Sequence, residues 1–330
     1  MSLAFVFNIE KATMRIAFTS CMTSFHFPVQ PVWDEIAAVD PDVLVLLGDS
    51  AYYDADGSSM SAVKSMSAFG FATHAHGRIE KQLRVANFQS LVARPGLTTY
   101  AIWDDHDFMF NGACGAQIAR QPDLSPLIAP SRAIFNAYRA ALASRLAPGS
   151  FPRGPPGFDK TTPAPGYGNH LLGEGVLLHL TDGRSFKKKG GKKALLGTEQ
   201  VAAIEAACEA ADGSTVHLIA SGIAFDARNG ETWLDCEDEY EWMLKLARKH
   251  RVLILSGDIH DNNLATYQLG GGKNLFEATS SGAAIATAVT IGAVQRNWGL
   301  LDIDADSVGI QIFKSGTLQY RGTIERGQWQ

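Results

Sequence analysis

Short runs of apolar residues, each followed within two positions by a small or acidic residue, recur along the chain. The runs are rich in β-branched side chains and lack polar alternation, which is typical of strands buried on both faces. They predict strands at 15–19, 43–47, 99–103, 176–180, 216–220 and 252–255. Serine, cysteine or aspartate follows each run, so polar side chains gather where the predicted strands end.

Helical patterns separate several of these strands. The clearest covers 235–250, with acidic residues in its first turn and basic residues in its last, as the helix dipole favours. Similar patterns cover 198–211 and 131–146. Strands that alternate with helices predict an α/β fold with a largely parallel sheet, in which ligands bind beyond the carboxyl ends of the strands.

Two other segments interrupt this alternation. Proline and glycine are frequent in 149–168, which predicts an irregular loop. From 299 to 325, short β segments separated by turn residues predict antiparallel hairpins at the sheet edge. The pattern contains no linker or internal repeat, so residues 1–330 are predicted to form a single domain.

Composition and charge narrow the class of protein. The 330 residues are 46% hydrophobic and 19% charged, which is the balance of a globular protein rather than a disordered one. A formal net charge of -5 provides no overall positive field, which argues against a role as a nucleic-acid scaffold. The apolar runs are far shorter than the roughly 20 residues of a membrane helix, so no membrane segment is expected.

The compartment and the oligomeric state stay open at this point. The sequence as written has no leader, which favours the cytoplasm, whereas a chain from which a leader had been removed would be periplasmic or secreted. No feature of the sequence indicates how many copies of the chain associate.

The first candidate for metal chemistry is the text GDSAYYD. Asp49 comes directly after a predicted strand and Gly48, and Tyr52 follows three residues later. A carboxylate at this point can bridge two cations, and Tyr52 is near enough in sequence to approach the same site. In the simpler interpretation, Asp49 only caps the following turn.

Two further segments follow strands in the same way. In WDDHDFMFN, from Trp103 to Asn111, three carboxylates and one imidazole occupy four consecutive positions. Their repulsion would destabilise a buried turn unless cations neutralised them, which favours a metal site over an exposed acidic loop. In LSGDIHDNN, Asp258 and His260 offer an oxygen and a nitrogen ligand from one loop. Together the three strand ends predict a dinuclear centre that positions a hydroxide for in-line attack on phosphorus.

Taken in order, these segments resemble those of the PhoD-like alkaline phosphatases and phosphodiesterases, relatives of the calcineurin-like metallophosphoesterases. The resemblance runs from about residue 15 to residue 282 and implies an αββα sandwich, with helices outside two facing sheets and metals at the carboxyl ends of the strands. The matching texts are SC at 20–21, PDVLVLLGDSAYYD at 41–54, WDDHD at 103–107, DGRSF at 182–186, LGTEQ at 196–200, SGDIH at 256–260 and EATSSG at 277–282.

The resemblance also implies roles for individual residues. Cys21, Asp49 and Tyr52 match positions that hold a trivalent iron, with Asp49 bridging to one or more divalent ions. His106 matches the histidine that contacts phosphate and protonates the leaving oxygen. Arg184 falls with Asp182 in an Asp-x-Arg motif that is either structural or on the substrate side, where Arg184 would bind substrate. The residues that match the remaining metal-binding loops are Asp105, Asn111, Asp258 and His260.

The expected cofactor is therefore a dinuclear or multinuclear centre with Fe(III) and a divalent ion, which is calcium in the best-known type and otherwise magnesium, manganese or zinc. The expected activity is hydrolysis of a small phosphoric monoester or diester. The alternative is a noncatalytic module that binds phosphate or phospholipid through its metals. A nucleotide-binding oxidoreductase is disfavoured because no GxGxxG turn follows the first strand.

One segment departs from the pattern of the family. Residues 187–193 contain five lysines and two glycines. Such a dense positive run predicts a solvated loop or, in the alternative interpretation, a flap that contacts polyanions.

Overall fold

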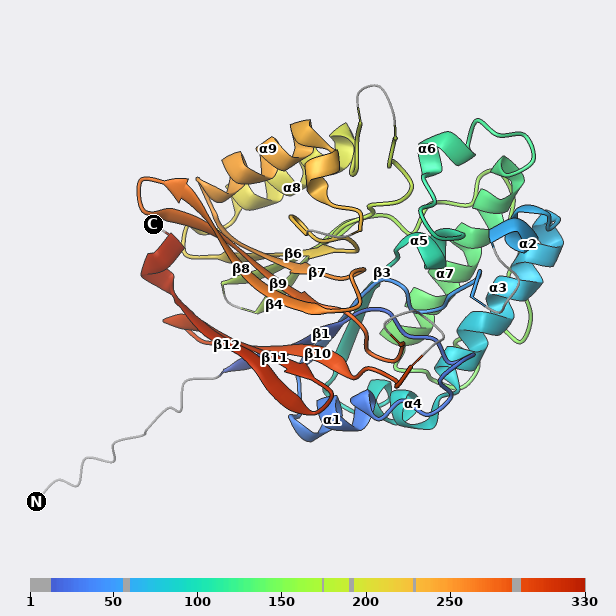
Figure 1. Ribbon diagram of the computed structural model, residues 1–330, viewed down its shortest axis with the longest axis horizontal. Helices are drawn as coiled ribbons and strands as arrows, with labels where there is room; N and C mark the ends of the chain where they lie inside the picture. Colours follow the sequence, from blue (N-terminus) through green and yellow to red (C-terminus); the bar gives the residue numbers. More distant parts are fainter. Residues whose placement is uncertain are drawn as a thin grey trace, which may run out of the picture.

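The computed structural model describes residues 13–55, 60–173, 175–189, 193–227, 230–286 and 292–329. Within these ranges, two six-stranded sheets face each other and helices cover their outer faces (Figure 1). This arrangement is the predicted αββα sandwich. A search of the same ranges for a helix long and apolar enough to cross a membrane finds none.

The first sheet combines a parallel part with an antiparallel extension. β1, β2 and β3 run parallel, whereas β10 pairs antiparallel with β1 and is followed by two further antiparallel strands. The hairpins predicted for 299–325 are thereby confirmed. Across the sheet the order is β12 (Thr317–Glu325), β11 (Ser307–Lys314), β10 (Asn297–Ile303), β1 (Met14–Thr19), β2 (Val43–Leu47) and β3 (Thr98–Ile102).

The second sheet is also mixed, so the prediction of a largely parallel sheet is wrong in part. Its two edge strands, β4 and β8, are antiparallel to their neighbours. Both were missed because their partly exposed residues do not form a continuous apolar run. The order is β4 (Gly168–Gly173), β5 (Val176–Leu180), β6 (Val216–Ser221), β7 (Arg251–Ser256), β9 (Lys273–Ser280) and β8 (Asn262–Gly270).

The period of two in a strand divides the buried residues into three layers. In β2, Val43, Val45 and Leu47 belong to the core between the two sheets, together with Leu218 and Leu253 of the second sheet. The alternate residues of β2 face the other way and pack under helices. A third apolar cluster lies between the second sheet and the two helices α8 (Thr198–Ala210) and α9 (Glu237–Ala247), which cover it in Figure 1.

Helix ends agree with the predicted segments to within a few residues. The helix predicted for 131–146 ends at Ala143, because Arg145 and Leu146 both have a φ of 55° and leave the right-handed helix. The predicted loop 149–168 is free of helix and strand up to Gly168, where β4 begins. The helices are α1 (Val32–Ala38), α2 (Met60–Lys64), α3 (Ala68–Leu83), α4 (Ala86–Val92), α5 (Asp105–Phe108), α6 (Gly115–Ile118), α7 (Ile128–Ala143), α8 (Thr198–Ala210) and α9 (Glu237–Ala247), with 3-10 turns at Ser125–Leu127, Trp233–Asp235 and Arg326–Trp329.

Candidate metal centre

The carboxyl ends of strands from both sheets meet at one edge of the sandwich. Cys21 follows β1, Asp49 follows β2 and Asp105 follows β3, all in the first sheet. Asp258 and His260 follow β7 in the second sheet. Backbone bonds connect the turns: the N–H of Cys21 donates to the carbonyl oxygen of residue 48 at 3.2 Å, and the N–H of residue 22 donates to the Asp49 carbonyl at 2.9 Å.

Two glycines allow the strand ends to approach this closely. A Cβ on Gly48 would lie 2.5 Å from the Cβ of Asp104, and the φ of Gly48 is +99°. A Cβ on Gly257 would lie 2.5 Å from Oγ of Ser20, which belongs to the opposite sheet's turn. Any side chain at either position would push the two turns apart.

Four candidate ligands have a left-handed backbone. The φ angles are 61° at Cys21, 54° at Asp49, 71° at Asp258 and 51° at His260. Such angles are uncommon for residues other than glycine, and each costs about 1–3 kcal/mol that the surrounding structure must offset. Strained turns of this kind cluster at functional sites, because the rest of the fold holds a side chain where its chemistry is needed.

Asp49 lies at the centre of the site. It belongs to three overlapping groups of potential ligand atoms, and within each group all atoms lie within 4.8 Å of one another. A carboxylate shared by several such groups could bridge two cations. The groups are Cys21 with Asp49 and His260; Asp49 with Asp105 and His106; and Asp49 with Asp104, Asp105 and Asp258.

The electrostatics of this cluster fit a cation. Burial first, and then the nearby Cys21 and Asp105, raise the pKa of Asp49 well above its usual value. Burial, Asp104 and Asp105 likewise raise the pKa of Asp258 to about 7. Oδ1 of Asp49 is buried and has no hydrogen-bond partner among the residues described. A buried carboxylate oxygen without a donor is costly, and a cation would satisfy it.

A thiol and a phenol lie on one side of Asp49. Sγ of Cys21 is 3.5 Å from Oδ2 of Asp49 and accepts a hydrogen bond from Oγ of Ser281 at 3.2 Å. The hydroxyl of Tyr52 lies 2.9 Å from Nε2 of His260. Burial raises the pKa of Cys21 to about 11 and that of Tyr52 well above its usual value, so both keep their protons unless a metal displaces them.

His106 packs against the ring of Tyr52, with 4.1 Å between ring centroids, in a carboxylate-rich environment. Its Nδ1 is 2.5 Å from Oδ1 of Asp54. Burial lowers the pKa of His106, but Asp105, Asp49 and the bond to Asp54 outweigh burial and raise that pKa to about 10. The protonated imidazolium, which these carboxylates favour, is the form that can donate a proton.

Arg184 is completely buried and contacts protein carboxylates. Its Nε and Nη2 donate to Asp104 at 2.5 and 2.8 Å, and its Nη1 donates to Glu231 at 2.5 Å. Asp182 accepts hydrogen bonds from the indole of Trp103 and from the backbone of Arg184. The substrate-side role of Arg184 stays a prediction. Its two hydrogen bonds to Asp104 hold that carboxylate at the end of β3.

The lysine segment begins with a buried residue. Lys187 is 3% exposed, and its Nζ donates to Glu231 at 2.6 Å. The prediction of a solvated loop is therefore wrong at Lys187, because Glu231 compensates the buried charge. Residues 190–192 lie outside the described residues.

Asn111 is exposed, and its backbone N–H donates to Oδ2 of Asp54 at 2.8 Å. Its role as a metal ligand stays a prediction. Sequence reasoning gave no individual role to Asp54, Asp104, Glu231 or Ser281. Three of them lie within texts that the sequence analysis singled out: Asp54 in GDSAYYD, Asp104 in WDDHDFMFN and Ser281 in EATSSG. Glu231 had no such signal, because a contact with the distant Arg184 recruits it.

Comparisons with known proteins agree with this fold. No protein-family model and no curated protein matches the sequence. Among solved structures, that of PhoD matches with a TM-score of 0.64 and 14% identity, over 95% of this chain and 68% of that one. A dimetal phosphatase from Danio rerio matches with a TM-score of 0.53 and 9% identity, over 95% of this chain and 99% of that one. The chain has a metallophosphoesterase fold.

Proposed function

We propose that the protein is a PhoD-like, metal-dependent hydrolase of phosphoric monoesters or diesters. The observation that carries the proposal is the position of Asp49, which is shared by three ligand groups and has a buried oxygen without a donor. Similarity of fold to PhoD and to a dimetal phosphatase supports it.

The donor set favours two kinds of cation. Cys21, Tyr52 and His260 provide a thiolate, a phenolate and an imidazole beside Asp49, a set that suits Fe(III) better than calcium or magnesium. In another group around Asp49, Asp105 and Asp258 provide the oxygen ligands that hard divalent ions prefer. When bound, such cations would neutralise phosphoryl oxygens and lower the pKa of a bound water.

The protein's own residues would orient the ester and move a proton. Asp54 holds Nδ1 of His106, which leaves Nε2 to donate a proton to the departing alcohol oxygen. A cavity of about 710 Å³ opens beside His260 and would hold the organic part of the ester. Tyr267 and Lys314 line this cavity, and Lys314 pairs with Asp261 at 2.7 Å.

The test is turnover of p-nitrophenyl phosphate and of its bis ester before and after chelation. Turnover that disappears with the metals and returns when iron and calcium are restored would support the proposal. A fully metal-loaded protein that binds phosphate but hydrolyses neither ester would instead be the noncatalytic binding module.

A further inference from the structure

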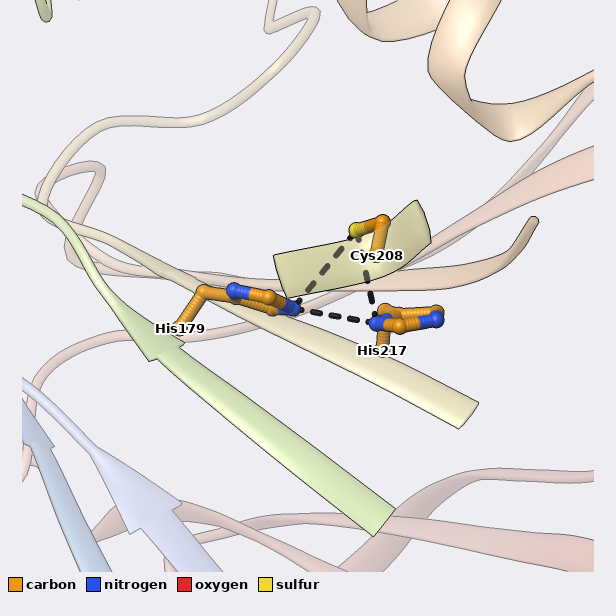
Figure 2. A group of neighbouring side chains, drawn as sticks. All are labelled: His179, Cys208 and His217. Carbon is orange, nitrogen blue, oxygen red and sulfur yellow. Dashed lines mark hydrogen bonds between the residues drawn. The ribbon is translucent and has the colours of Figure 1, made fainter. Parts of the chain in front are cut away.

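Two histidines and a cysteine meet in a second place, on the outer face of the second sheet (Figure 2). In β5, Leu178 points into the core between the sheets, so its neighbour His179 points outward. In β6, Leu218 points inward and its neighbour His217 points outward. The pairing of β5 with β6 sets His179 opposite residue 219, so the two imidazoles are diagonal neighbours on one face.

Helix α8 provides the third side chain. Its buried residues are Gln200, Ile204 and Cys208, which are four positions apart and form one helical stripe. This stripe faces the sheet, and Cys208 lies over the two imidazoles in Figure 2. Cys208, His179 and His217 are each no more than 1% exposed.

The three ligand atoms have the spacing of a metal coordination sphere. Nε2 of His179 lies 3.1 Å from Nδ1 of His217, and Sγ of Cys208 lies 3.8 and 3.4 Å from these two nitrogens. In a tetrahedral zinc site, bonds of about 2.0–2.1 Å to nitrogen and 2.3 Å to sulfur separate two nitrogens by about 3.3 Å, and nitrogen from sulfur by about 3.6 Å. The observed triangle matches these edges to within about 0.3 Å.

A neighbouring amide fixes which nitrogen of His179 is available. Nδ2 of Asn169 donates to the carbonyl oxygen of Ala203 at 3.3 Å, so Oδ1 of Asn169 faces the ring of His179. Nδ1 of His179 donates to this oxygen at 2.7 Å and therefore carries the proton. The lone pair is thus on Nε2, the atom that faces Cys208 and His217. In metal sites, a hydrogen-bond acceptor on the second ring nitrogen orients a ligating histidine in the same way.

The charges around the three residues also suit a cation. Burial and proximity to other histidines lower the pKa of His179 to about 3 and that of His217 to about 4, so both rings are neutral donors. A dication with one thiolate would leave one positive charge. Burial first, and then Glu205 and Glu209 of α8, raise the pKa of the Cys208 thiol, so these two carboxylates lie near enough to offset that charge.

We propose that His179, Cys208 and His217 form a second metal site, which binds one zinc-class ion and ties α8 to β5 and β6. Two imidazoles and a thiolate form a borderline-soft donor set, which favours zinc over calcium or magnesium. The thiol proton is released to solvent on binding. The role is structural, because the ion would join a helix to two strands in the layer that α8 and α9 cover.

The experiment measures zinc stoichiometry and thermal stability in the full chain. Chelated protein is titrated with Zn²⁺ against a chromophoric competitor, for the unchanged sequence and for Cys208→Ser. The matched control is Cys236→Ser, since Cys236 is 2% exposed in the same apolar cluster and belongs to no ligand group among the residues described. We expect Cys208→Ser to bind one zinc fewer and to lose part of the zinc-dependent rise in Tm, while Cys236→Ser keeps both.

Cobalt gives a second readout that separates this site from the centre around Asp49. The unchanged protein should absorb more strongly than Cys208→Ser in the thiolate-to-cobalt charge-transfer band. The difference should be the absorption that one cobalt–thiolate bond per chain contributes. The His179→Gln variant repeats the test without altering the thiol. Equal zinc stoichiometry in the unchanged protein, Cys208→Ser and His179→Gln would overturn the proposal and leave a hydrogen-bonded triad. Because ester hydrolysis is not the readout, this result is independent of the proposed function.

Discussion

The hydroxyl of Tyr52 lies 2.9 Å from Nε2 of His260, although 208 positions separate the two residues in the chain. Tyr52 follows β2 of the first sheet and His260 follows β7 of the second, so this contact joins the two sheets across the candidate metal centre. Sγ of Cys21 lies in a ligand group with the same histidine. One cation could therefore bind a phenolate, a thiolate and an imidazole from three strand ends.

The first prediction concerns the metal on this side of Asp49. Protein isolated from iron-replete cells should be coloured, because phenolate and thiolate ligands give charge-transfer bands with Fe(III). Tyr52→Phe should shift or bleach the band and reduce turnover, and Cys21→Ser should lower the iron content most. Metal analysis and visible absorption give the measurements. An active enzyme without iron, whose metal content and rate survive both changes, would require a purely divalent centre instead.

The second prediction concerns Asp49 itself. Asp49→Asn should reduce turnover by more than about 100-fold, since even outer-shell changes around a metal cost about 10–100-fold in affinity or activity. The fold should persist, because a neutral amide is easier to bury than a carboxylate. The exposed Asp123→Asn serves as the control. Wild-type turnover at wild-type metal content in Asp49→Asn would exclude its bridging role.

The third prediction separates proton donation from phosphate binding at His106. His106→Ala should slow esters with poor leaving groups by about 10²–10⁴-fold and nitrophenyl esters much less, since only poor leaving groups need a proton in the transition state. Asp54→Asn should show a weaker form of the same pattern, because Asp54 holds Nδ1 of the ring. Equal losses for both classes of ester would leave His106 as a phosphate contact. His74→Ala is the control, since His74 instead contacts the carbonyl oxygen of Tyr53.

The fourth prediction is a pH dependence of the chelated protein. Burial and two nearby carboxylates raise the pKa of Asp258 from 3.8 to about 7. Between these values the folded state holds a proton that the unfolded state has released, so the free energy of unfolding falls as pH rises. The Tm of chelated protein should therefore drop from about pH 4.5 to about pH 7.5, and the drop should be smaller in Asp258→Asn. Parallel Tm curves for the two proteins would argue against this coupling.

The fifth prediction follows from the buried start of the lysine segment. Lys187→Met should lower the free energy of unfolding by about 1.5–3 kcal/mol, the range for a hydrogen bond to a charged group. Arg184 and Lys189 still contact Glu231, which limits the loss. Lys193→Met is the matched control. Lys193 is exposed, and its ion pair with an exposed carboxylate is long, at 3.6 Å. Chemical denaturation measures both, and equal stability of the two variants would contradict the buried ion pair.

The sequence by itself determined the strands that carry the centre and the residues at their ends. A strand buried on both faces needs a continuous apolar run, so β1, β2, β3 and β7 were visible as such runs. Parallel strands present their carboxyl ends at one edge of a sheet, so Cys21, Asp49 and Asp105 could be expected to meet. Asp258 follows a strand of the second sheet, and the packing of the two sheets brings it to the same edge. The edge strands β4 and β8 were invisible, because half-exposed strands mix polar and apolar residues.

Only the tertiary structure decided which distant side chains complete each site. Asp54 reaches His106, and Glu231 reaches Arg184, through loops whose path depends on the whole packing. His179, Cys208 and His217 come together because β5 pairs with β6 and α8 turns its buried stripe onto their outer face. Nothing in the spacing of these three residues indicates a site, because their proximity depends on strand pairing and helix packing rather than on sequence order.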